Sequence, residues 1–224
     1  AENANGSKNG IEVAHIVGFT LQYAFVHEIE GHYGVVGRFV QRLEVIETEF
    51  RRWTHAGLFL MPECEDVRIA GNLFDTATSQ TMPNTYTFGT GADGTMQGLF
   101  FVRNLIVENN TFQNNPRWEG IDCHGGENIL IRNNRIRNVR MGIMVGLSVN
   151  SSSGDPYVLF PVLRNVLIEG NEIEKGNDSP ALSRGIIVHG GETDGFIGRN
   201  VRVSANKIRG FNLAGAFWFD NIDG

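Results

Sequence analysis

The sequence predicts an all-β chain folded as a parallel β-helix, a single solenoid of about seven rungs. Three observations lead to this fold. A pattern apolar-x-apolar-x-x-Asn-x-Phe/Ile occurs five times, two looser copies precede it, and a second asparagine keeps step with the first. The Asn-equivalent positions of these copies are residues 24, 48, 72, 110, 134, 171 and 206. Their spacings of 24, 24, 38, 24, 37 and 35 residues correspond to a 24-residue unit that carries three insertions.

Each unit is expected to contain three short strands. The apolar pair before each Asn lies two residues apart, which is strand periodicity, and no sustained helical period competes with it. A second strand follows a glycine and a third follows the Asn, and equivalent strands should stack about 4.8 Å apart. The Asn-bearing strands are expected to begin at Phe19, Leu43, Val67, Leu105, Ile129, Val166 and Val201. The glycine strands are expected at Gly57, Gly98, Gly120, Gly142 and Gly185.

Two asparagine columns follow from this register. An amide side chain both donates and accepts, so identical amides stacked rung on rung bond to one another and satisfy buried turn backbone. The members of the first column are Asn72, Asn110, Asn134, Asn171 and Asn206. The members of the second, which precedes the Asn-bearing strand, are Asn104, Asn128, Asn165 and Asn200.

The charged residues keep the same register and mostly alternate in sign from rung to rung, as favourable neighbours on adjacent strands do. The expected columns are Glu65, Arg103, Glu127, Arg164 and Arg199; Glu108, Arg132 and Glu169; Arg135, Glu172 and Lys207; and Arg137, Glu174 and Arg209. These columns account for three members of the basic run Arg132, Arg135, Arg137 and Arg140, and leave only Arg140 unassigned.

Composition narrows the function classes. The chain has 224 residues and a formal net charge of −6, which argues against a general nucleic-acid binder. No run of 18 apolar residues is present, so we expect no membrane span. The two cysteines, Cys64 and Cys123, fall at different points of the rung and give no reason to expect a disulfide.

We expect a flexible segment over residues 1–10 and one β-helix domain over residues 11–224. The chain stops shortly after the apolar strand Phe217–Phe219, where no polar cap for the terminal rung is recognisable. The expectation is therefore a piece of a longer polypeptide, or a chain that relies on a partner.

After the scaffold is subtracted, the unexplained residues cluster in two near-copies of one segment, 120–127 (GIDCHGGE) and 185–192 (GIIVHGGE). Strand alternation should point Asp122 and His124 outward. His189 should share the column of His124 two rungs away, at roughly 10 Å. Gly146 lies between them and should leave open space above His124. The insertions 77–97, 146–162 and 175–184 should border a groove along this strand.

The outward column beside this groove is otherwise apolar, with Phe59, Met61, Phe100, Val102 and Met144 expected on it. Such a stripe indicates either a ligand surface or a surface covered by a loop or a neighbouring subunit. Trp118 should border the groove, where its ring could stack on a sugar or pack under a loop.

Asp122 and His124 form the leading catalytic candidate. A carboxylate that accepts one imidazole proton fixes the tautomer and raises the basicity of the ring, so His124 could abstract or donate a proton at a sugar. The alternative interpretation is a hydrogen-bonded structural pair. His189 is a second catalytic candidate. For a glycosidase, the nearest pair of carboxyl groups is Asp122 with Glu119.

The Gly-Ile strand followed by the Asn-bearing strand resembles the common pattern of the right-handed parallel β-helix superfamily, the pectate-lyase-like fold, over roughly residues 11–220. The resemblance implies polysaccharide bound in a groove along the first strand of each rung. Bacteriophage tailspike depolymerases are similar in their irregular insertions and in an end completed by trimerisation. The segment 120–124 also resembles the Asp-Pro-His-Asp motif of mannuronan C5-epimerases, with Cys123 and Gly125 at the places of Pro and the second Asp. The motif set of the polygalacturonases is not found.

The expected function is cleavage of a capsular or uronate-containing polysaccharide, by a lyase or a glycoside hydrolase. The catalytic candidates are Asp122, His124, His189 and Glu119, and the substrate-binding candidates are Arg117, Trp118, Arg140 and Glu192. No cofactor is expected, and no metal, because apolar Phe100 and Met144 should flank Asp122. The expected partners are a polysaccharide and further copies of the chain in a homotrimer, in an extracellular or virion-associated setting. The alternatives are a non-catalytic carbohydrate-binding or shaft segment of a tail fibre or adhesin, and a uronan C5-epimerase.

Overall fold

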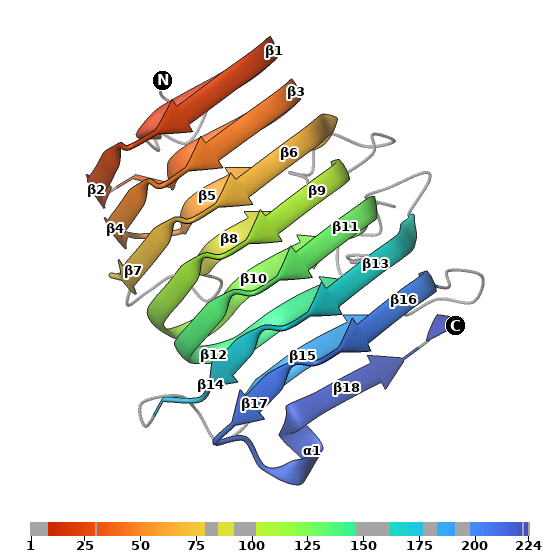
Figure 1. The fold of residues 1–224 in the computed structure, drawn as a ribbon. Helices are drawn as coiled ribbons and strands as arrows, with labels where there is room; N and C mark the ends of the chain where they lie inside the picture. Colours follow the sequence, from red (N-terminus) through yellow and green to blue (C-terminus); the bar gives the residue numbers. More distant parts are fainter. Residues whose placement is uncertain are drawn as a thin grey trace, which may run out of the picture.

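The computed structural model describes residues 9–29, 31–78, 85–91, 102–146, 162–176, 183–190, 198–220 and 222–223. These residues form a right-handed parallel β-helix whose rungs follow one another from β1 at one end to β18 at the other (Figure 1). The strand pairings are parallel throughout this part of the chain. The one described helix is the single turn α1 (Leu213–Ala216), which precedes β18. No described helix has the length and apolar character needed to cross a membrane.

The strands stack into three faces, and the first face carries the candidate site. It consists of the glycine strands and their equivalents: the beginnings of β1 (Ile11–Gln22) and β3 (Tyr33–Ile46), then β5 (Ala56–Leu60), β8 (Tyr86–Thr90), the ends of β10 (Thr111–His124) and β12 (Arg135–Gly146), β15 (Arg184–His189) and β18 (Phe217–Asp220).

The second face holds the apolar pairs that precede each Asn, and the third face holds the short strands that follow it. The second face consists of the ends of β1 and β3, then β6 (Cys64–Ala70), β9 (Val102–Glu108), β11 (Gly126–Arg132), β13 (Leu163–Glu169), β16 (Gly198–Ser204) and β19 (Ile222–Asp223). The third face consists of β2 (Phe25–Ile29), β4 (Glu49–Trp53), β7 (Leu73–Ala77), the beginnings of β10 and β12, β14 (Glu172–Glu174) and β17 (Lys207–Arg209).

The core fills the inside of the coil with stacked side chains from all three faces. On the third face Phe50, Phe74 and Phe112 stack ring on ring, with centroid separations of 4.5 and 4.9 Å. Both cysteines are free thiols buried in this core. Because every rung packs only on its neighbours, the 24-residue sequence period becomes a vertical column of side chains.

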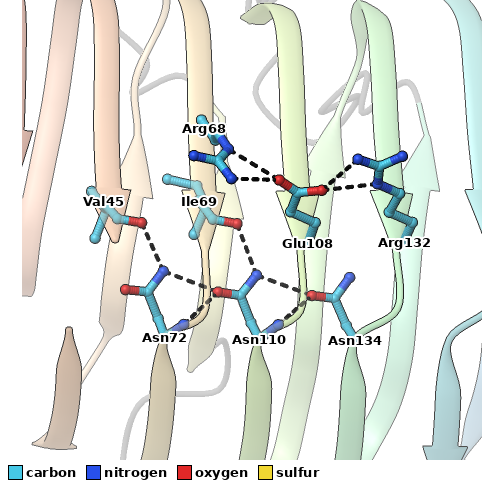
Figure 2. Close-up of polar contacts among 8 residues, drawn as sticks. All are labelled: Val45, Arg68, Ile69, Asn72, Glu108, Asn110, Arg132 and Asn134. Carbon is cyan, nitrogen blue, oxygen red and sulfur yellow. Dashed lines mark hydrogen bonds and ion pairs between the residues drawn. The ribbon is translucent and has the colours of Figure 1, made fainter. Parts of the chain in front are cut away.

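The buried asparagine ladder has the predicted register (Figure 2). Asn72 Nδ2 donates to Asn110 Oδ1 over 2.9 Å, and Asn110 Nδ2 donates to Asn134 Oδ1 over 3.0 Å. Each amide also donates to a strand carbonyl of the preceding rung, such as Val45 O or Ile69 O, and each Oδ1 accepts a backbone N–H. The ladder continues through Asn171 to Asn206. It therefore satisfies backbone groups that the turn between the second and third faces would otherwise bury unpaired.

The second column is an exposed ladder, and its backbone explains its composition. Asn128 Nδ2 donates to Asn104 Oδ1, and Asn104 Nδ2 donates to Asp66 Oδ1, both over 2.8 Å. All members of this column have φ between +54° and +58°, a left-handed conformation that Asn and Asp tolerate better than other side chains. The sequence analysis missed a third ladder of the same kind, in which Asn138 donates to Asn114 and Asn114 to Asp75.

The charge columns also have the predicted register. Glu108 accepts hydrogen bonds from Arg68 and Arg132 on the two flanking rungs (Figure 2), and the pair of arginines holds the pKa of its carboxyl below the usual value. Arg135 and Arg137 lie 3.9 and 3.6 Å from carboxylate oxygens of the next rung. The basic run is therefore structural for these arginines, as the sequence indicated.

One rung was assigned wrongly. Its first-face strand is β8, not a strand at Gly98, which lies outside the described residues. The expected insertion 77–97 is therefore interrupted by a strand, and the neighbour of Asp122 on β8 is Gly89 rather than Phe100. Val102 belongs to β9 and is buried in the core. The local sequence misled because Gly98-Leu99 matches the glycine-strand pattern and lies shortly before the Asn-bearing strand.

The apolar stripe of the first face is covered at Phe59 and Met61, in agreement with the second of the two alternatives that the sequence left open. Each retains 7% of its surface, and they pack in a satellite cluster with Tyr33, Val36 and Ala56. Exposed apolar residues occur instead at the terminal rungs, where Phe217, Trp218 and Phe219 are each nearly half exposed.

Candidate functional site

The end of β10 positions the leading candidate pair on the outer side of the first face. Ile121 and Cys123 point into the core and are fully buried, so the residues between and after them point away from it. His124 Nε2 lies 2.8 Å from Asp122 Oδ2. The structure thus brings together the two residues that the sequence singled out.

The pair is less accessible than outward-pointing strand residues usually are. Asp122 retains 1% of its surface, and the His124 side chain retains 19%. Asp122 lies between Gly89 on β8 and Met144 on β12. A Cβ placed on Gly89 would lie 2.9 Å from the Phe59 ring, so the glycine makes room for that ring beside the carboxylate.

His124 is bordered by glycines on both neighbouring rungs, and rings occupy the space above both of them. A Cβ on Gly91 would lie 3.0 Å from Phe59 Cζ and 3.6 Å from His124 Cδ2. A Cβ on Gly146 would lie 2.4 Å from both Cδ2 and Nε2 of His189. The open space expected above His124 at Gly146 is therefore filled by the His189 imidazole, because a long side chain from the next rung covers a neighbour that has none.

His189 does share the column of His124, since Gly146 pairs with both. Its ring also lies nearly parallel to that of Trp218, with centroids 6.4 Å apart and an interplanar angle of 20°. The two imidazoles thus lie along one line on the outer face, and His189 borders the catalytic candidate rather than standing apart from it.

Glu119 is buried on the same stretch of β10, with 2% of its surface exposed. Burial raises the pKa of this carboxyl well above its usual value, repulsion from Asp122 adds to the increase, and attraction to Arg140 offsets part of it. The environment of Glu119 therefore favours the protonated form of its carboxyl group. The pKa of His124 is a balance: burial lowers it, but the charge and hydrogen bond of Asp122 raise it, and the increase prevails.

The substrate-binding candidates are placed differently from one another. The Arg140 guanidinium lies over the Trp118 ring, with Cζ 4.7 Å from the ring centroid, so this face of the indole is covered. Arg117 is exposed at the side of the same strand. Glu192 lies outside the described residues, as do 79–84, 92–97, 147–161 and 177–182 of the segments expected to wall the groove. The groove itself stays a prediction.

Several polar atoms in this cluster are buried yet have no hydrogen-bond partner in the described part of the chain. They are Glu119 Oε2, Asp122 Oδ1 and Oδ2, His124 Nδ1 and Arg140 Nε, although Asp122 Oδ2 lies within ion-pair distance of His124 Nε2. Native proteins leave few such groups, and a concentration of them on two adjacent strands is typical of a binding or catalytic site. An imidazole, a carboxyl group with a raised pKa and a guanidinium lie within this one cluster, and such groups can move protons on a polar substrate.

Sequence reasoning missed the ring cluster that continues from this site toward the N-terminus. Tyr33 stacks on Phe59 at 5.1 Å, and His55 stacks on Tyr86 at 5.6 Å. Burial, followed by the charge of nearby His32, lowers the pKa of His55 to about 4, so its ring is neutral at physiological pH. The sequence signal for this ring cluster was the pair Gly89 and Gly91, because glycines two residues apart leave room on the outer side of the sheet for large neighbouring side chains.

No group of three or more His, Cys, Asp or Glu side chains close enough to hold a metal ion occurs among the described residues. The expectation that the site uses no metal stays untested.

Comparison with known proteins gives few relatives. No family model matches the sequence, and no curated protein does. Three solved structures are similar: the tailspike protein gp49 of Pseudomonas phage LKA1 (12% identity, TM-score 0.43), tailspike protein 2 of Escherichia coli O157:H7 bacteriophage CAB120 (14%, 0.35) and the family 28 exopolygalacturonase of Yersinia enterocolitica (13%, 0.21). They cover 96, 84 and 95% of this chain, which in turn spans 44, 25 and 45% of theirs. At this degree of similarity they establish no activity for it.

Proposed function

We propose that this chain is the polysaccharide-cleaving part of a β-helix protein, and that it cleaves uronate-containing chains by β-elimination. The observation that carries the proposal is the juxtaposition on one strand of an imidazole in contact with a carboxylate and a second, buried carboxyl group whose pKa is raised. The pKa values of both Glu119 and His124 are raised by their surroundings, and perturbed titratable groups gathered at one place are a common sign of acid–base chemistry.

In this proposal His124 is the base and Asp122 is a positioning residue. The neutral imidazole removes the proton from C5 of a uronate, the C4–C5 double bond forms, and the C4–O bond to the leaving sugar breaks. Glu119 donates its proton to that departing oxygen, so charge does not accumulate on it. Arg140, or exposed Arg117, neutralises the uronate carboxylate while the carbanion character develops.

Hydrolysis is the second candidate, because Glu119 and Asp122 interact as two neighbouring carboxyl groups. There Glu119 would again be the acid, and Asp122 would activate water or attack the sugar directly. Elimination is favoured because an oxygen of Asp122 lies 2.8 Å from His124, and this contact leaves the carboxylate less free to act on water. A C5-epimerase would use the same base without breaking the chain, and a binding module would use none of these groups.

The test is incubation with a panel of uronate-containing and capsular polysaccharides. β-Elimination gives unsaturated ends that absorb in the ultraviolet, hydrolysis gives new reducing ends without that absorbance, and epimerisation changes the C5 configuration seen by NMR at constant chain length. His124→Ala should lower the initial rate by about 100- to 10,000-fold. The matched control is His27→Ala on the exposed third face, which should leave the rate unchanged.

Cleavage that His124→Ala and Glu119→Gln both leave intact would refute the assigned roles. Absence of any change in every polymer would favour the non-catalytic binding or shaft segment. The proposal also includes a homotrimer in an extracellular or virion-associated setting. Light scattering on the purified chain tests its oligomeric state directly.

A further inference from the structure

A hollow with both polar and apolar lining lies on the outer side of the second face, away from the strand that carries Asp122 and His124. It spans rungs β1, β3, β6 and β9 and has a volume of about 530 Å³. Its lining includes Thr20, Arg42, Glu44, Asp66 and Arg68. This volume falls within the range of small-ligand sites in proteins.

The two arginines of the hollow point in opposite directions, which is what opens it. Arg68 is held toward the C-terminal rungs, because its Nε and Nη2 both lie within 3.0 Å of Glu108 Oε1 (Figure 2). Arg42 leans toward the N-terminal rung, since a Cβ on Gly18 would lie 3.9 Å from its Nη2. Glu44 pairs in register with Arg68, yet Arg68 is turned away from it.

The hollow presents hydrogen-bonding groups that the protein does not use itself. The side chains of Thr20, Arg42 and Glu44 have no hydrogen bond or ion pair to any residue within the described ranges. Asp66 accepts a hydrogen bond from Asn104 through Oδ1 and also lines the hollow. Donors and acceptors therefore occur on the three successive rungs of β1, β3 and β6, with the half-buried Ile106 side chain as an apolar patch beside them.

We infer that this hollow binds a short oligosaccharide, and that it is a carbohydrate site separate from the Asp122–His124 site. Because Arg68 is engaged by Glu108, the guanidinium of Arg42 is more than balanced by the carboxylates of Glu44 and Asp66, and a phosphate or another small anion is not preferred. A sugar ring offers adjacent hydroxyls and a C–H face. The hydroxyls can donate hydrogen bonds to a carboxylate and accept them from a guanidinium, and the C–H face can pack on the isoleucine side chain. The inference does not depend on the chain being an enzyme.

The test is NMR titration of the ¹⁵N-labelled chain with five trisaccharides at millimolar concentration: maltotriose, cellotriose, mannotriose, triacetylchitotriose and trigalacturonate. At least one should shift the amide signals of Thr20, Glu44 and Ile106. Arg42→Ala and Glu44→Gln should each weaken that binding about tenfold, because each removes a charge-assisted hydrogen bond. Both positions are at the surface, so the fold is expected to survive.

Arg202→Ala is the matched control, because Arg202 is exposed on the column of Glu44 and Arg68 but lies beyond the hollow. It should leave the affinity unchanged. His124→Ala should do so too, which separates this site from the proposed catalytic one. The inference is overturned if none of the five sugars shifts these signals, if the shifts are confined to the first face, or if they persist unchanged in Arg42→Ala and Glu44→Gln.

Discussion

Replacement of Asn110 by alanine is expected to lower the free energy of unfolding by about 5 kcal/mol. The Asn110 side chain makes four hydrogen bonds of 2.9–3.0 Å (Figure 2): it donates to Ile69 O and to Asn134 Oδ1, and it accepts from the backbone N–H and from Nδ2 of Asn72. The Asn72 N–H would remain buried without a partner, which costs about 2 kcal/mol, and the loss of each of the other three bonds costs about 1 kcal/mol.

The measurement is urea unfolding with linear extrapolation, compared with Asn128→Gly in the exposed ladder. Asn128 also bonds to both neighbours, over 2.8 and 2.9 Å, but these bonds face water. Glycine tolerates the φ of +58° at this position, so only exposed amide contacts are lost and about 1 kcal/mol is expected. Equal destabilisation by the two substitutions would refute the view that the inner ladder stabilises the fold by satisfying buried backbone.

Three further outcomes are expected. Gly146→Ala should lower both stability and activity, because the new Cβ would lie 2.4 Å from the His189 ring; wild-type thermal unfolding and activity would contradict this packing. Glu108→Gln should lower the free energy of unfolding near neutral pH but not at low pH. A carboxyl whose pKa is lowered in the folded state stabilises the fold above its usual pKa, and this stabilisation is lost as the pH falls. Urea midpoints of the two proteins measured across pH test the sign of this difference. Asp122→Asn should shift the NMR titration of His124 to lower pH, since burial remains while the raising charge is gone, and an unchanged midpoint would exclude the coupling.

Register was predictable because each rung touches only its neighbours. Once Asn110 and Asn134 are recognised as equivalent, every residue 24 positions apart becomes a strand neighbour, and Glu108 beside Arg132 follows without further information. The Asp122–His124 contact was predictable for a similar reason, because residues two apart on one strand share a face.

The features that the sequence did not predict depend on where an insertion lies within the unit or on the conformation of individual side chains. The insertion between Asn72 and Asn110 hid β8, since a glycine strand can be placed at either end of it. Nothing in the period says that the His189 ring reaches back over Gly146, or that Phe59 fills the space at Gly89. The burial of Glu119, and with it the raised pKa of its carboxyl, depends on those same packing choices.

The direction of the inter-rung hydrogen bonds has a mechanical consequence. In a solenoid the backbone bonds between stacked strands run along the long axis, so a pull on the two ends loads them one after another rather than all together. Under such tension the terminal coil should peel off first, and each coil of 24 residues would release roughly 80 Å of extended chain. A force–extension trace would then show a staircase of small, similar steps, with longer steps at the coils that carry insertions.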